Sequence, residues 1–293
     1  MRRLVDRAQA EICRALEACD GEASFGVDAW RRPGGGGGFS RVLQDGRVFE
    51  KAGVNVAEIH GELSPEGARA ALGERADGGR FHATGLSLVI HPRNPMVPSV
   101  HANYRYFELE SGAATWWFGG GSDLSPSYLF AEDAAHFHRV HKDVCDRFDP
   151  AFYGTAKARC DEYFRLPHRG ESRGVGGIFF DRLNGRDPEE LLALVSDCAA
   201  AFLPAYLPVV QRRKDLPYTD EQRRWQLLRR GRYAEFNLVC DRGTAFGLRT
   251  DGRTESILMS LPPLARWEYG HEPRAGSAEA RLLDVLRYPR SWA

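Results

Sequence analysis

Two stretches of this chain alternate in polarity with a period of two residues, and this alternation constrains the fold more than any other feature. Residues 86–91 are expected to form a strand with Leu86, Leu88 and Ile90 on one face and Ser87, Val89 and His91 on the other. A second strand is expected after Pro98. One of its faces carries His101, Asn103, Arg105 and Phe107, and the other carries Val100, Ala102, Tyr104 and Tyr106. The first of these faces is a row of hydrogen-bonding groups with a fixed cation. It suits an anionic, planar or carboxylate-bearing ligand, whereas the second face is expected to pack.

Further strands and helices follow in an order that favours an α+β fold. Strands are expected at 115–126, where a glycine turn would present Asp123, and at 173–183. Residues 232–263 are expected to form two or three antiparallel strands. Helices are expected after Ser64, at 131–148 and at 187–210, where Asp187 is the cap and Pro204 and Pro208 should kink or end the helix. We therefore expect a large, mostly antiparallel β-sheet flanked by helices on both faces.

Composition narrows the functional classes. Forty Lys and Arg residues balance forty Asp and Glu residues, which argues against a nucleic-acid or membrane-surface binder. The N-terminal segment, residues 1–29, is expected to be helical because Leu4, Ala8, Ile12 and Leu16 share one face. No stretch has signal-peptide character or approaches the length of a membrane span. The six cysteines form no C-x-x-C pair, so we expect a reduced, cytoplasmic protein.

Three segments of biased composition have a structural and a functional interpretation. The glycine run 34–38 is either a mobile surface loop or a lid over a ligand. The aromatic residues 116–118 belong either to the core or to the floor of a pocket for a flat ligand. The basic stretch 223–232 is expected to form a solvated helix face, because the whole chain is neutral.

Several charged residues lie where they could do chemistry. The arginines beside glycines or in strands are Arg105, Arg173, Arg242 and Arg253, and the backbone amide of Gly252 could help Arg253 to bind a carboxylate. Asp123 and Asp241 end mostly apolar strands, where a carboxylate needs a partner. Either could brace a turn by pairing with an arginine, or could anchor or deprotonate an N–H group of a ligand. His91, His101, His138 and His168 are candidate metal ligands, although their spacing matches no compact metal motif.

Five blocks together resemble one known family. They are GVNVAEIHGEL, GLSLVIHPRNPMVPSVHANYRYFE, WWFGGGSDLSPSY, CDEYFRLPHRGESRGVGGIFFD and GRYAEFNLVCDRGTAFGLRTDGRTESILMSLPPLARWEY. From about Trp30 to the C-terminus the chain resembles the oxygen-dependent coproporphyrinogen III oxidases of haem biosynthesis. The resemblance implies a single domain over residues 1–293, a large antiparallel sheet flanked by helices, and a homodimer. It also implies oxidative decarboxylation of the ring A and B propionates of coproporphyrinogen III by molecular oxygen, which gives protoporphyrinogen IX, carbon dioxide and hydrogen peroxide.

The resemblance also implies roles for individual residues. Carried over by position, the substrate contacts are Ser87, Asn103, Tyr104, Arg105, Gly252 and Arg253. His101 is similar to the family's proton donor, and Asp123, Asp241 and Arg242 are similar to its carboxylate and pyrrole contacts. His91, His101, His138 and His168 fall where a divalent metal site is proposed. Asp251 stands where close relatives often have glycine, and it places a negative charge near a substrate with four carboxylates.

The cofactor requirement can be argued from absent motifs. The C-x-x-x-C-x-x-C cluster motif of the oxygen-independent route does not occur, and no nucleotide-binding fingerprint indicates flavin or NAD. Oxygen is therefore expected to react with the substrate directly, with no organic cofactor and no essential metal. Two alternatives remain: a non-catalytic tetrapyrrole carrier, and a metal hydrolase that uses the histidines and aspartates.

Overall fold

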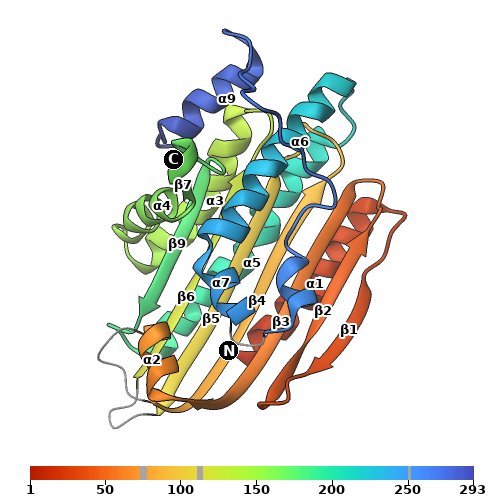
Figure 1. Ribbon diagram of the computed structural model, residues 1–293. Coiled ribbons are helices and arrows are strands. Elements are labelled where there is room, and N and C mark those ends of the chain that lie inside the picture. The colour runs from red at the N-terminus through yellow and green to blue at the C-terminus, as the bar shows by residue number, and fades with distance from the viewer. Residues whose placement is uncertain (73–77, 111–114, 250–251) are drawn as a thin grey trace.

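A seven-stranded antiparallel sheet forms the centre of the computed structural model, which describes residues 1–72, 78–110, 115–249 and 252–293 (Figure 1). Six strands follow one another as a meander, and the seventh adds at the far edge. In spatial order they are β1 (Gly26–Arg31), β2 (Gly36–Gln44), β3 (Phe49–Leu63), β4 (Gly79–Pro92), β5 (Ser99–Glu110), β6 (Thr115–Ser125) and β9 (Gly176–Leu183). A separate two-stranded ribbon pairs β7 (Arg165–Leu166) with β8 (Glu171–Ser172), around the 3₁₀ turn η1 (Pro167–Arg169).

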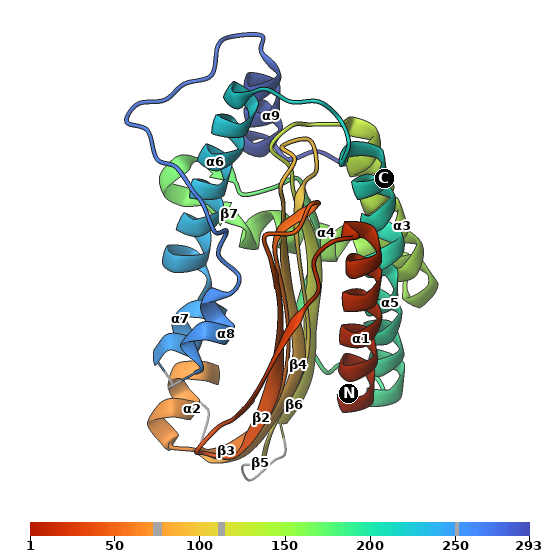
Figure 2. The ribbon, with the colours of Figure 1, turned by 90° about the vertical axis from the view of Figure 1, so that its right-hand side faces the viewer.

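Helices cover both faces of this sheet, as expected for the α+β class (Figure 2). One face is covered by α1 (Arg2–Asp20), α3 (Ala131–Phe148) and α5 (Pro188–Arg213). The other carries α2 (Pro65–Leu72), α6 (Asp220–Glu235), the π-helical turn η2 (Phe236–Cys240), α7 (Arg242–Arg249) and α8 (Thr254–Leu258). The remaining helices are α4 (Phe152–Tyr163), which packs on β9, and α9 (Ala278–Arg287).

The alternation of β4 and β5 determines which face is core. Leu86, Leu88, Ile90, Val100, Ala102 and Tyr104 are all buried in the main core cluster. The Tyr104 hydroxyl donates a hydrogen bond to the backbone oxygen of Cys198 in α5, at 2.9 Å. The alternate residues, including Ser87, His101 and Asn103, face the opposite side and line a cavity. The prediction from the period-two pattern is therefore confirmed for both strands.

Helix α5 begins as predicted but does not end at its prolines. The Asp187 carboxylate accepts hydrogen bonds from the amides of Glu189 and Glu190. Because Pro208 has no N–H, the backbone oxygen of Pro204 loses its helical donor, and the ring of His136 takes that place at 3.0 Å. The 26-residue helix is long and apolar enough to cross a bilayer, contrary to the expectation, but it is a mostly buried core helix beneath the sheet.

The expected C-terminal strands at 232–263 are wrong, because this region is helical. Helix α6 starts with a capping box formed by Thr219 and Gln222, and helical backbone continues through η2 into α7. The alternation in residues 233–239 is only seven residues long, and such a short pattern also fits consecutive turns of a helix. The segment therefore contributes a helical cover over the sheet instead of additional strands.

The basic stretch in α6 is not a solvated face. Arg230 and Arg223 both bind the buried carboxylate of Glu50, at 2.6 and 2.7 Å, and Arg229 binds Glu171 at 2.7 Å. These arginines connect the helical layer to β3 and β8. The neutral charge of the whole chain therefore did not indicate that these arginines form internal ion pairs.

Two glycine-rich segments lie in strands instead of loops. Gly36 to Gly38 begin β2, where added Cβ atoms would lie 2.2–2.3 Å from backbone oxygens, so the run is the tight end of a hairpin and not a lid. Gly119 to Gly121 lie within β6, so Asp123 is presented by a strand and not by a turn. The N-terminal helix is confirmed only to Asp20, because β1 occupies residues 26–31 of the segment expected to be helical up to residue 29.

Candidate active site

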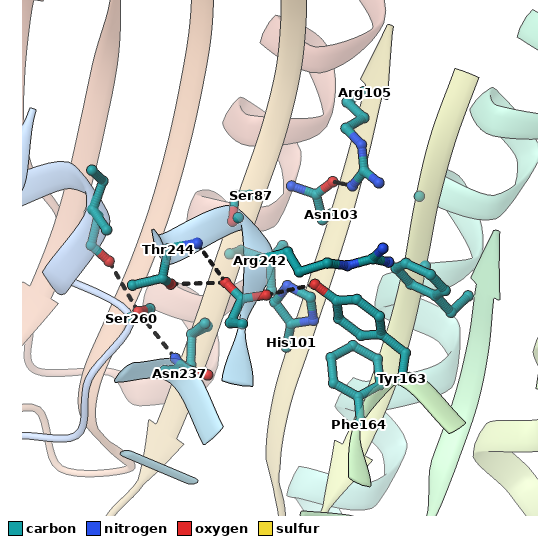
Figure 3. Close-up of a pocket in the computed structure, with 18 of the residues that line it drawn as sticks. Ser87, His101, Asn103, Arg105, Tyr163, Phe164, Asn237, Arg242, Thr244 and Ser260 are labelled. Carbon is teal, nitrogen blue, oxygen red and sulfur yellow. Dashed lines mark hydrogen bonds between the residues drawn. The ribbon is translucent and has the colours of Figure 1, made fainter. Parts of the chain in front are cut away.

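A cavity of about 500 Å³ lies between the open face of the sheet and the layer formed by η2, α7 and α8 (Figure 3). The sheet side contributes mainly polar side chains and glycines. The helical side contributes polar groups and a few apolar ones. The lining includes Asn55, Ser87, His101, Asn103, Arg105, Tyr163, Phe164, Phe179, Asp181, Arg182, Asn237, Asp241, Arg242, Thr244, Ser256 and Ser260.

Strand register brings the sheet-side residues together in rows. Ser87 of β4 is opposite Asn103 of β5, which in turn is opposite Gly121 of β6. One pleat away, His101 is opposite Asp123. Residues two apart on a strand point to the same face, so these rows form a continuous polar floor.

His101 is oriented by a buried carboxylate. Its Nδ1 lies 2.8 Å from Oδ1 of Asp123, which is 1% exposed, while the imidazole itself remains partly exposed to the cavity. An ionised carboxylate can only accept, so Nδ1–H of His101 donates this hydrogen bond, and Nε2 is the ring nitrogen that remains available. This arrangement lets His101 exchange a proton with a molecule in the cavity.

Arg173 holds Asp123 ionised. Its guanidinium donates to both carboxylate oxygens, at 2.9 and 3.1 Å, and also to Asn237 at 2.9 Å. The guanidinium lies 4.1–4.7 Å from the ring centres of Phe164, Tyr233 and Phe236. Burial by itself would raise the pKa of Asp123, but the charge of Arg173 and the hydrogen bond from His101 outweigh it, and the pKa lies below its ordinary value.

Arg105 is fixed at a second point of the floor. Its guanidinium donates to Asn103 at 2.7 Å and to Asp181 of β9 at 2.8 Å. Gly119 makes this pairing possible, because a Cβ there would lie 2.8 Å from the Asp181 oxygen and 2.9 Å from Nε of Arg105. The cation is thus held in place and still borders the cavity.

Asp241 faces the floor from the helical side. One of its oxygens accepts from the Tyr163 hydroxyl at 2.7 Å, and the other accepts from the Thr244 amide and hydroxyl, each at 2.8 Å. Burial favours a raised pKa for Asp241, but these hydrogen bonds dominate and the pKa is lowered. Asp241 is therefore an ionised acceptor that also caps the start of α7.

Asp241 and Arg242 both reach the cavity although they are neighbours in sequence. The residue pair lies where η2 ends and α7 begins, so no strand alternation separates the two side chains. The guanidinium of Arg242 lies 5.1 Å from the centre of the Tyr163 ring. Figure 3 shows Arg242 and His101 among the side chains that line the cavity.

Three predicted substrate contacts lie elsewhere. The Tyr104 side chain is 1% exposed and points into the core on the opposite face, so it is not available to a ligand in the cavity. The Gly252 amide donates to the backbone oxygen of Gly247 at 2.8 Å, so it is not free to bind a carboxylate. Arg253 forms an ion pair with Asp28 of β1, outside the cavity lining. Asp251 lies outside the described residues.

The four candidate metal-binding histidines do not form one site. His91 bonds to Ser99 and to the Ser260 backbone oxygen, and His138 bonds to Tyr153 and to the Val175 backbone oxygen. His168 pairs with Glu235 on the surface. Within the described parts of the chain, no group of three or more His, Cys, Asp or Glu side chains is arranged to hold a metal ion. These residues do not fit a shared ligand set.

Sequence reasoning did not identify several residues of the site. Tyr163, Asp181, Arg182 and Asn237 all line the cavity. Tyr163 comes from α4, and Asn237 from a π-helical turn that a local pattern does not predict. Only strand pairing and helix packing place them beside His101 and Asp241.

Comparison with known proteins identifies the family of this chain. A family model described as coproporphyrinogen III oxidase matches residues 1–292. The chain is 55% identical over 300 residues to the chloroplastic oxygen-dependent coproporphyrinogen-III oxidase of Glycine max, covering 99% of this chain and 78% of that protein. It is 52% identical to the Prochlorococcus marinus (strain MIT 9313) enzyme of the same name, with 99% and 89% covered. It is 54% identical to the mitochondrial enzyme of Rattus norvegicus, with 100% and 68% covered. The chain therefore belongs to the coproporphyrinogen III oxidase family.

Proposed function

We propose that this chain is an oxygen-dependent coproporphyrinogen III oxidase, which converts two propionates of its substrate to vinyl groups. The observation that carries the proposal is the cavity itself. It presents the oriented imidazole of His101, arginines for carboxylates and the ionised carboxylate of Asp241, from opposite walls. A porphyrinogen offers the complementary groups, with carboxylates at its periphery and N–H donors at its centre.

The balance of the reaction indicates where a proton donor is needed. Each reacting propionate releases carbon dioxide, two electrons and one proton as its side chain becomes a vinyl group. Molecular oxygen takes up two electrons and two protons to become hydrogen peroxide. One further proton must be supplied for each decarboxylation, and His101 faces the cavity with its other nitrogen held by Asp123.

The remaining residues would bind and orient the substrate. Arg105, Ser87 and Asn103 offer a cation and neutral donors on the floor, and Arg242 offers a second cation opposite them. Asp241 would accept hydrogen bonds from the pyrrole N–H groups, away from the propionates that it would repel. An electron-rich pyrrole can then reduce oxygen directly, so the proposal includes no organic cofactor and no essential metal. His91, His138 and His168 each bond to different partners, and this supports a mechanism without an essential metal.

An assay with coproporphyrinogen III, with and without oxygen and with and without a chelator, tests the proposal. We expect oxygen-dependent formation of protoporphyrinogen and hydrogen peroxide that survives chelation. A carrier would bind the substrate without forming peroxide, and a metal hydrolase would lose activity with chelator and would not need oxygen. Stoichiometric bound metal whose loss and return govern activity would overturn the cofactor part alone.

We further propose that the protein is a cytoplasmic homodimer. Leu238 and Val239 on η2 are 53% and 73% exposed, and Leu248 on α7 is also exposed, so this helical segment presents apolar side chains to solvent. This segment is helical where antiparallel strands were expected over residues 232–263. All six cysteines are free thiols, which supports a reducing compartment. Light scattering at micromolar concentration should give a dimer that Val239→Glu weakens; a monomeric wild type would contradict the dimer.

A further inference from the structure

Arg182 lines the cavity even though strand alternation would turn it away. On β9, Phe179 and Asp181 face the cavity, and Phe180 between them is 1% exposed in the core. In a regular strand, residue 182 would join Phe180 on the core side. It instead lies among the lining residues beside Asp181.

A β-bulge explains this orientation. Phe118 is opposite Leu183 and Gly120 is opposite Phe180, so the single residue Gly119 faces both residues 181 and 182. The extra residue restores Leu183 to the core side, where it packs against the main cluster. Arg182 itself has a φ of 55°, which is unusual for a residue with a long side chain. Such a conformation is often retained where it positions a side chain for function.

Arg182 also differs from other cations of the site in its partners. Arg173 is paired with Asp123, and Arg105 is paired with Asp181. Among the described residues, no carboxylate pairs with Arg182. The centre of the Trp117 ring lies 6.0 Å from its guanidinium carbon. Arg182 is thus an exposed cation at the cavity with its hydrogen-bonding capacity open to a ligand.

The position of the bulge places Arg182 far from His101. The bulge is opposite Gly119, which pairs with Arg105, and Arg105 is four residues along β5 from His101. At 3.4 Å per residue this is roughly 14 Å along the strand. A group bound by Arg182 would therefore lie at the opposite end of the cavity from the proposed proton donor.

We propose that Arg182 is a further specificity-determining residue, which binds one substrate propionate at the end of the cavity remote from His101. This inference rests on the proposed function, because it takes the ligand to be a polycarboxylate macrocycle. Arg182 would hold the ring in register and would not take part in the chemistry. Its loss should therefore weaken binding and leave kcat nearly unchanged.

Three substitutions separate the charge from the backbone conformation. Arg182→Ala removes the charge and keeps the unfavourable φ, whereas Arg182→Gly removes the charge and relieves it. Arg182→Lys keeps the charge. Arg186→Ala is the matched control, because Arg186 lies nearby in sequence but pairs with Asp149 and Glu190 outside the cavity.

The dissociation constant of coproporphyrin III, the oxidised tetracarboxylate, can be measured by fluorescence titration at two salt concentrations. We expect about tenfold weaker binding for both the alanine and glycine variants, about 1.4 kcal/mol, with a smaller salt dependence. The lysine variant and the Arg186 control should bind like the wild type, and the glycine variant should melt no lower than the alanine variant.

The outcomes distinguish this inference from the function on which it rests. If the wild type turns over coproporphyrinogen III but both neutral variants bind coproporphyrin III as tightly as it does, Arg182 is not a contact. Weaker binding in the alanine variant alone would assign the effect to the backbone and would also overturn the inference. A wild type that neither binds nor converts the substrate would refute the proposed function itself.

Discussion

At the scale of single residues, Arg173 has the least freedom in the site. Its side chain is 2% exposed, and its guanidinium is enclosed by three aromatic rings and donates hydrogen bonds to Asp123 and Asn237. Arg173 borders the cavity, but its guanidinium is already paired with Asp123 and Asn237. Its contribution is to keep Asp123 ionised, and through Asp123 to fix the ring of His101.

Breaking that pair should unfold the protein more readily. Asp123→Asn leaves the buried guanidinium without its counter-charge, and we expect the free energy of unfolding to fall by about 3–5 kcal/mol. The double variant Asp123→Leu with Arg173→Met should recover much of this loss in urea titrations, because it removes both charges. It should remain inactive, since His101 is no longer oriented. A fully active double variant would show that the ion pair has a structural role only.

Asp241→Asn tests the acceptor role at the opposite wall. Asparagine still caps α7 through its amide oxygen, so folding should change little. The anionic acceptor for the pyrrole N–H groups is lost. We expect substrate affinity to stay within roughly tenfold, about 1.4 kcal/mol, and the single-turnover rate to fall much further.

Thr244→Val is the control for Asp241, because it removes one hydrogen bond to the carboxylate and keeps the charge. It should weaken the helix start without losing the chemical step. If Asp241→Asn turns over at the wild-type rate, Asp241 serves only as the cap of α7.

At the scale of elements, the limits of sequence reasoning have identifiable physical causes. The strands around Ser87 and His101 were predictable because one face packs in the core and the other does not, which leaves a strict period of two. The helical segment after Tyr233 was mispredicted because its apolar residues satisfy both periods over a short distance. In the structure, Thr219 and Gln222 form a capping box at the start of α6, a helix signal that the interpretation of residues 232–263 as strands left out.

The same reasoning explains which site residues were predictable. His101, Asn103 and Arg105 share a strand face, so a local pattern brings them together. Tyr163 meets Asp241 only through the packing of α4 against η2, which are 78 residues apart at that contact. Arg182 reaches the cavity only because of a bulge, and a bulge changes the facing of a residue without any clear signal in the local pattern.

The geometry of the hairpin formed by β1 and β2 leads to a prediction that opposes the lid hypothesis. Gly36 has a φ of 85°, and an added Cβ would lie 2.2 Å from the backbone oxygen of Glu58. We expect Gly36→Ala to lower the free energy of unfolding by about 2 kcal/mol or more, with normal turnover per folded molecule. Thermal denaturation and active-site titration measure the two quantities.

Gly34→Ala is the matched control in the same run, because its added Cβ would meet only the mobile end of the Arg32 side chain. It should change stability little. If Gly36→Ala lost turnover without losing stability, the result would favour the lid hypothesis.

At the scale of the whole molecule, one face of the sheet forms the core and the other face lines the cavity. One face is closed by α1, α3 and α5 and holds most of the core, whereas the other face leaves a cavity beneath α7 and α8 (Figure 2). The packed face also buries neutral histidines. His138 and His141 lie on α3 with no exposed surface, and burial lowers their pKa to about 3 and about 4.

These histidines should make the fold sensitive to mild acid. In the unfolded chain their pKa returns to about 6.5, so below that pH the unfolded state binds more protons than the folded state. The free energy of unfolding should be fully retained above pH 6.5 and should fall as the pH drops toward 4. By pH 5.5 each histidine should cost about 1.4 kcal/mol. Carboxylates such as Asp123, whose pKa is lowered, lose their contribution only at more acidic pH.

Urea titrations between pH 7.5 and 5 at one protein concentration measure this slope. His141→Leu should reduce the slope by about one proton, because it removes a group whose pKa burial lowers. Leucine should be tolerated there, because among the described residues Nε2 of His141 has no hydrogen-bond partner and the ring packs 4.5 Å from that of Phe137. A stability that is flat down to pH 5.5 in the wild type would mean that the folded state takes up protons as readily as the unfolded chain. Burial would then not lower the pKa of these imidazoles, and the prediction would be wrong.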